Sequence, residues 1–81
     1  MDQYTHLALL HSKAANEMKL YRVRMELARE NEKLLQEGNK VLRAKYESNL
    51  DLYASLAQRS MDSYHTIMDE IETIHASNFT V

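Results

Sequence analysis

Residues 36–40, Gln36-Glu37-Gly38-Asn39-Lys40, contain the single glycine of an 81-residue chain that has no proline. Glycine readily adopts the left-handed conformation that ends many helices, and Asn39 belongs to a residue type that caps the start of the next one. This stretch therefore predicts a turn between two long helices, which gives an all-α antiparallel hairpin. The alternative is one continuous helix, since a lone glycine costs a helix only about 1 kcal/mol.

The segment before the turn, about residues 4–36, repeats in heptads. Steps of three and four residues join a line of mostly apolar side chains, which is typical of a helix face packed against a neighbour. We call this line the first seam, and its polar interruptions are His11 and Glu32. Its members are Tyr4, Leu7, His11, Ala14, Met18, Tyr21, Met25, Ala28, Glu32 and Leu35.

The segment after the turn, about residues 40–76, carries a second and more regular seam. Ala54, Met61 and Met68 widen it on one side. The tail, residues 77–81, leaves the pattern, and we expect it to fray. The members of the second seam are Tyr46, Leu50, Tyr53, Ala57, Ser60, Tyr64, Ile67, Ile71 and Ile74.

A further apolar stripe runs along the first helix and consists of Leu20, Val23, Leu27 and Leu34, continued by Val41. On a helical wheel it points nearly opposite to the first seam, so a single neighbouring helix is not expected to cover both. Large aliphatic side chains left in water forgo about 1.5–3 kcal/mol each. The stripe therefore predicts a binding surface, either the core of a homodimeric four-helix bundle or a groove for a different protein.

Composition and charge narrow the class of protein. Absence of cysteine excludes disulfides, and no apolar run approaches the roughly 18–20 residues that span a membrane or the pattern of an export signal. We therefore expect a soluble, cytoplasmic protein of one domain. Residues 1–45 hold nine Lys/Arg and six Asp/Glu, whereas residues 46–81 hold one and six. Opposite charge on the two helices favours packing them together, or pairing two chains as an antiparallel dimer.

A basic line on the first helix raises the possibility of a nucleic-acid-binding dimer. Glu26 interrupts the line, and acidic residues flank it, so a solvated outer face is the preferred interpretation. The basic residues are Lys19, Arg22, Arg29, Lys33, Lys40 and Arg43.

The sequence shows no pattern typical of catalysis or of cofactor binding. Neither histidine pair, His6 with His11 or His65 with His75, has the spacing that places two imidazoles on one helical face for a metal. A phosphate-binding glycine loop and a cysteine nucleophile are also missing from the sequence. We expect a protein that is not an enzyme and has no cofactor or metal.

Two short stretches, Leu9-Leu10-His11-Ser12-Lys13 and Glu30-Asn31-Glu32-Lys33-Leu34-Leu35, give the chain a resemblance to the small helical-hairpin co-chaperones of bacterial type III secretion. Members of that family help to hold needle or export subunits unpolymerised in the cytoplasm. The resemblance implies a heteromeric complex in which the exposed stripe grips another helical protein.

The leading hypothesis is a small chaperone, adaptor or inhibitor that binds a partner polypeptide through its surplus apolar surface. The alternatives are a purely structural homo-oligomer and the nucleic-acid-binding dimer.

Overall fold

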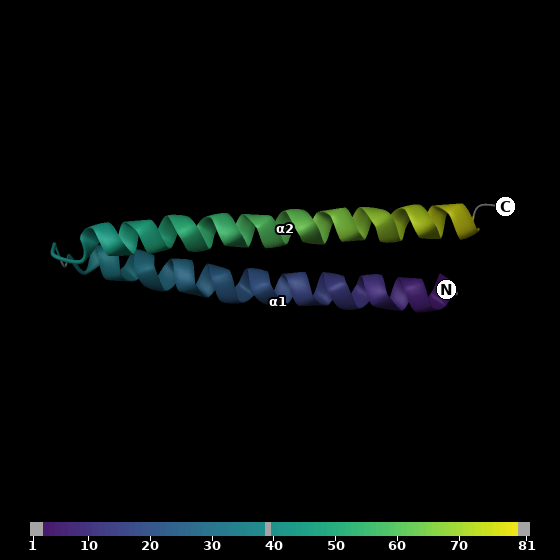
Figure 1. The fold of residues 1–81 in the computed structure, drawn as a ribbon, viewed down its shortest axis with the longest axis horizontal. Coiled ribbons are helices and arrows are strands. Elements are labelled where there is room, and N and C mark those ends of the chain that lie inside the picture. Colours follow the sequence, from purple (N-terminus) through teal and green to yellow (C-terminus); the bar gives the residue numbers. More distant parts are fainter. Residues whose placement is uncertain (1–2, 39, 80–81) are drawn as a thin grey trace.

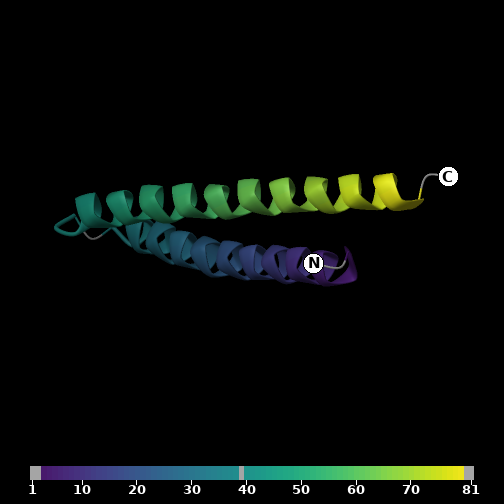
Figure 2. The same cartoon turned by 45° about the vertical axis from the view of Figure 1, so that its right-hand side comes forward.

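The structure is a computed structural model that describes residues 3–38 and 40–79, with side chains to Ser77. Two helices, α1 (Gln3–Gln36) and α2 (Arg43–Phe79), run antiparallel and side by side, as Figures 1 and 2 both show. No strand occurs in these two ranges. The predicted all-α hairpin is confirmed.

The turn follows from the backbone of Gly38, whose φ is +80°. Its N–H donates a hydrogen bond to the carbonyl of Leu35 at 3.2 Å, a bond that closes the end of α1 in a glycine-capped helix. The predicted left-handed glycine is confirmed, whereas the predicted cap, Asn39, lies outside the described residues.

Both ends of α2 differ from the expected bounds. The helix begins at Arg43 rather than near residue 40, because residues 40–42 form a turn and the Leu42 carbonyl accepts the N–H of Tyr46 at 3.0 Å. At the other end α2 continues to Phe79, past the expected bound at residue 76. No glycine or proline precedes that end to stop the helix. Residues 80–81 lie outside the described part.

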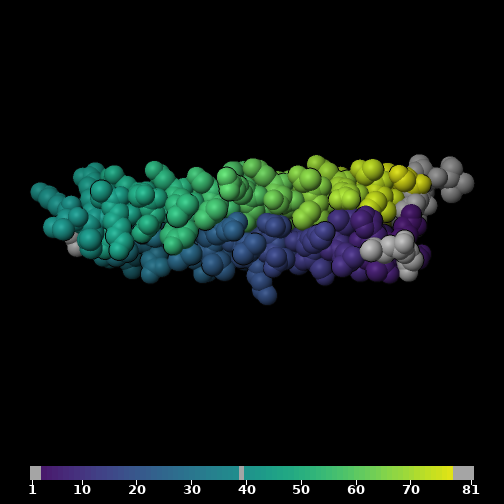
Figure 3. Space-filling model, in the orientation of Figure 1, coloured from purple at the N-terminus to yellow at the C-terminus, as the bar shows by residue number. Residues whose placement is uncertain are grey.

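The molecule is a thin rod of 63 × 17 × 14 Å. Its Cα radius of gyration is 18.2 Å, against roughly 12 Å for a compact domain of this length. Figure 3 shows the two helices in contact along the visible face from the turn to the opposite end. Neither helix, over its described residues, contains a segment long and apolar enough to cross a membrane.

Few side chains are fully buried in this rod. Two larger ones, Leu10 and Ile71, lie toward the end away from the turn, and the remainder are small or polar. Small residues let two helix backbones approach closely, but they bury little apolar area. The buried residues of the described part are Leu10, Ala14, Ala28, Asn31, Ala57, Ser60 and Ile71.

The line of contact on α1 differs from the first seam at alternate positions. Leu10 and Asn31 are buried, whereas the neighbouring seam positions His11 and Glu32 are exposed. Tyr4 is exposed as well. The prediction continued one three–four alternation from Tyr4, whereas hydrogen bonds across the hairpin let Arg24 and Asn31 occupy inner positions. The inner line of α1 is Leu7, Leu10, Ala14, Glu17, Tyr21, Arg24, Ala28, Asn31 and Leu35.

The remaining seam residues are all at least partly covered. Met18, Tyr21 and Met25 of α1 are half-buried. On α2 Ile71 is buried, and the following residues are half-buried: Tyr46, Leu50, Tyr53, Tyr64, Ile67 and Ile74.

Candidate protein-binding edge

Polar contacts between the helices fix their register at three levels. Near the open end, His6 Nε2 lies 3.7 Å from Glu70 Oε1. In the middle, Arg24 Nη1 donates to the hydroxyl of Ser60. Closer to the turn, Asn49 Nδ2 donates to Asn31 Oδ1 at 3.3 Å.

These contacts show which lines of side chains face each other. Residues seven apart on a helix point in nearly the same direction, so His6 shares a line with Leu20, and Glu70 shares a line with Leu56. Since His6 meets Glu70, the two lines lie on the same side of the hairpin. Leu27 and Leu34 extend the line on α1.

We call this side the leucine edge. Its large apolar residues are Leu20, Val23, Leu27 and Leu34 of α1, together with Leu52 and Leu56 of α2. Val23 and Leu52 are each 52% exposed, and the other four are half-buried. The helix pair by itself thus leaves this edge incompletely covered.

The structure therefore places four residues of the predicted stripe, Leu20, Val23, Leu27 and Leu34, on one edge, and Val41 apart from them. Leu20, Leu27 and Leu34 are half-buried because the stripe flanks the contact with α2 instead of pointing nearly opposite to it, so α2 covers part of the stripe as well as part of the first seam. Val41 does not continue the stripe on α1, because it lies in the turn, 90% exposed. The sequence analysis missed Leu52 and Leu56, because these residues can be assigned to this edge only when the register of the two helices is known.

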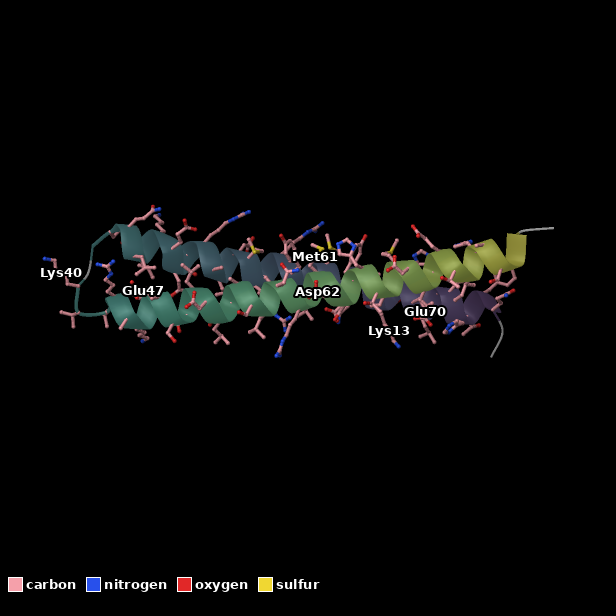
Figure 4. The ribbon with its side chains drawn as sticks, turned by 90° about the horizontal axis from the view of Figure 1, so that it is seen from above. Lys13, Lys40, Glu47, Met61, Asp62 and Glu70 are labelled. Carbon is pink, nitrogen blue, oxygen red and sulfur yellow. The ribbon has the colours of Figure 1, made fainter. Side chains whose placement is uncertain are left out.

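The opposite side of the hairpin is a methionine edge, formed by Met18 and Met25 of α1 and Met61 and Met68 of α2, all half-buried. Figure 4 shows Lys13 and Glu70 along one side of the rod and Met61 on the other. Lys13 and Glu70 belong to the two lines of the leucine edge. The apolar surface is therefore divided between two opposite edges of different chemistry.

Arg24 places a positive charge within the leucine edge. Its Nη1 donates to the Leu56 carbonyl at 3.0 Å and to the Ser60 hydroxyl, and the side chain is half-buried. No carboxylate of the described residues forms an ion pair with it; Glu47 pairs with Arg43, and Glu70 lies beside His6. A partly desolvated guanidinium with neutral acceptors alone favours an approaching carboxylate.

The exposed area of the chain is large for its mass. Its accessible surface is 6253 Å², whereas a compact monomer of 9.5 kDa exposes about 5,000 Å². The excess, about 1,200 Å², exceeds the roughly 800 Å² that each partner contributes to a standard protein interface. The rod therefore has enough surplus surface for one full interface.

Other features of the surface are less organised. The predicted basic residues of α1, Lys19, Arg22, Arg29 and Lys33, are all exposed, on the side of the helix turned away from α2. An open depression of about 250 Å³ also lies on this outer side, lined by Ser12, Ala15, Asn16 and Lys19 of α1 alone. No group of three or more metal-binding side chains occurs within the described residues.

Comparison with protein-family models, with curated proteins and with solved structures found no match for this chain. The resemblance to type III secretion co-chaperones therefore stays a prediction.

Proposed function

We propose that this protein is a cytoplasmic interaction module, of the chaperone, adaptor or inhibitor kind, that binds a helix of another protein chain along the leucine edge. The observation that carries this proposal is the concentration of half-buried and exposed aliphatic side chains on one side of the hairpin. Covering such residues contributes about 25 cal/mol for each Å² of apolar area removed from water.

The shape and charge of the edge define the helix that it receives. Because Leu20, Leu27 and Leu34 repeat every seven residues along α1, the occupant is a helix with its own apolar side chains at heptad spacing. Arg24 adds a requirement for a carboxylate near the middle of that helix. The bound form is a bundle of three or four helices.

Val23→Glu is the variant best suited to a test. Val23 is exposed, so replacing its side chain leaves the contact between α1 and α2 intact. Ala15→Glu is the matched control, since it adds the same charge at an exposed position on the outer side of α1. Wild type and both variants are used to capture proteins from the source cell. Each captured protein is then purified and titrated directly against the three chains.

We expect Val23→Glu to weaken direct binding of the purified partner at least about tenfold and Ala15→Glu to leave it unchanged. Equal capture and equal affinity for wild type and Val23→Glu would refute the leucine edge as the binding surface. Circular dichroism on the same samples shows whether both variants keep the helical content of wild type.

A further inference from the structure

We infer that the helix received by the leucine edge is α1 of a second copy of this chain, antiparallel to the first and related to it by a twofold axis at Leu27. This inference rests on the proposed function, because it names the occupant of the same edge. It adds a defined register in which opposite charges of the two copies lie at the same level.

The leucine spacing of α1 is symmetric about Leu27. Leu20 and Leu34 each lie seven residues from it, on the same line of the helix. Two antiparallel copies of α1 centred there place Leu20 opposite Leu34 of the second copy, and Leu27 opposite its counterpart. A twofold interface needs this kind of self-complementary surface, in which one patch matches itself after rotation.

The charges in the middle of α1 match the same register. Arg24 and Glu30 lie three residues on either side of Leu27, so the register places each Arg24 level with Glu30 of the second copy, and this pairing of levels occurs twice. Arg24 is half-buried against α2, whereas Glu30 is exposed, so the two opposite charges share a level across the axis without forming a direct ion pair. The register also places Glu37 level with Glu17 of the second copy, a like-charge pairing near the end of the contact.

The edge of α2 has its apolar residues at the corresponding level. Since Arg24 contacts Ser60 and Asn31 contacts Asn49, the level of Leu27 on α2 falls between Asn49 and Ser60. Leu52 and Leu56 occupy that interval. The axis at Leu27 therefore brings the α2 leucines of both copies together, and the two hairpins form a four-helix bundle.

The surplus surface is sufficient for this assembly. Each copy exposes about 1,200 Å² more than a compact monomer of its mass, and a standard interface takes roughly 800 Å² from each partner. A second copy also supplies apolar contacts to a rod whose own core is mostly alanine, serine and asparagine.

Solution mass is the first measurement. Sedimentation of the wild-type chain across micromolar concentrations is expected to give twice the mass of 9.5 kDa. Leu27→Glu and Val23→Glu are expected to raise the dimer dissociation constant at least about a hundredfold and tenfold respectively, while Ala15→Glu leaves it unchanged. If Leu27→Glu fails to fold, Val23→Glu alone provides the comparison with wild type. A wild-type chain that remains monomeric throughout overturns the inference.

Cysteine cross-linking tests the register, because the chain has no cysteine of its own. Leu27→Cys is expected to form a disulfide-linked dimer on mild oxidation. Leu20→Cys is not expected to form one. Its two cysteines would lie about 20 Å apart along the helix axis, whereas a disulfide needs Cα atoms within roughly 7 Å. Mixing Leu20→Cys with Leu34→Cys is expected to restore the cross-link. Efficient linking of Leu20→Cys to itself overturns the antiparallel register.

The two proposals fail in different ways. If the wild-type chain is a monomer and Val23→Glu loses the captured partner, the inference of a second copy is refuted. The proposed function then stands. A dimer whose mass and cross-links are indifferent to every substitution on the leucine edge removes the second copy from that edge, and equal partner binding by wild type and Val23→Glu removes the proposed function as well. Glu30→Lys gives the last check: we expect it to weaken the dimer about tenfold, because it replaces two attractions across the axis by repulsions, and an unchanged dissociation constant contradicts the placement of Glu30 level with Arg24.

Discussion

Arg24 of α1 and Ser60 of α2 form a hydrogen bond across the hairpin, and the same guanidinium nitrogen also donates to the carbonyl of Leu56. Ser60 is 1% exposed, so its hydroxyl has exchanged water for this contact. The pair therefore holds the two helices at one register in the middle of the rod.

Ser60→Ala removes the acceptor at nearly constant volume. We expect the free energy of unfolding to fall by about 1 kcal/mol, because Arg24 then loses one of its two acceptors on α2. Urea denaturation followed by circular dichroism measures the change. Ser63→Ala, at an exposed position of the same helix, is the control, and an equal effect of the two substitutions would contradict the assignment.

Ala57→Leu tests the close approach of the helices. Ala57 is 1% exposed, and inserting a larger side chain into a packed contact typically costs about 1–3 kcal/mol. Ala54→Leu makes the same change at an exposed position one turn away and is expected to alter stability by less than about 0.5 kcal/mol. Thermal unfolding of both variants gives the comparison; if Ala57→Leu is as stable as wild type, the helices are more loosely packed than described.

Gly38→Ala tests the turn. The φ of +80° disfavours any side chain, although the space around Gly38 is open, so the expected loss of about 1 kcal/mol is conformational and not steric. Gly38→Asn is expected to lose less, because asparagine tolerates the left-handed region better than alanine. Chemical denaturation gives the free energy of unfolding of wild type and the two variants. A Gly38→Ala variant more stable than Gly38→Asn would contradict the expectation.

Asn31→Leu tests what a buried polar residue contributes. Its amide donates to the Leu27 carbonyl and accepts from Asn49. Leucine at this inner position is expected to raise stability by about 1 kcal/mol, because a buried polar residue in a helical interface fixes register at a cost in stability. Urea denaturation followed by circular dichroism reports the stability. A less stable variant would show that the hydrogen bonds of Asn31 outweigh apolar burial.

Much of the fold could be predicted from the sequence. A single glycine in a chain without proline located the turn, and the regular apolar spacing of α2 identified most of its contact face, including Ala57, Ser60 and Ile71. These features are local, and helix periodicity converts them directly into geometry.

The contact face of α1 was harder to predict, for a physical reason. Arg24 and Asn31 occupy inner positions because Ser60, Asn49 and backbone carbonyls on the hairpin accept or donate hydrogen bonds. Those partners are known only after the helices are aligned. A search that continues one three–four alternation along the helix chooses Met25 and Glu32 and passes over their neighbours Arg24 and Asn31.

The start of α1 and the end of α2 lie together at one end of the rod, and the turn lies at the other (Figure 1). The rod is 63 Å long. A domain or tether joined to either helix end is therefore held a full rod length from whatever touches the turn, and the long sides between them stay accessible. The hairpin thus sets the separation between its turn and its paired helix ends by the length of two uninterrupted helices.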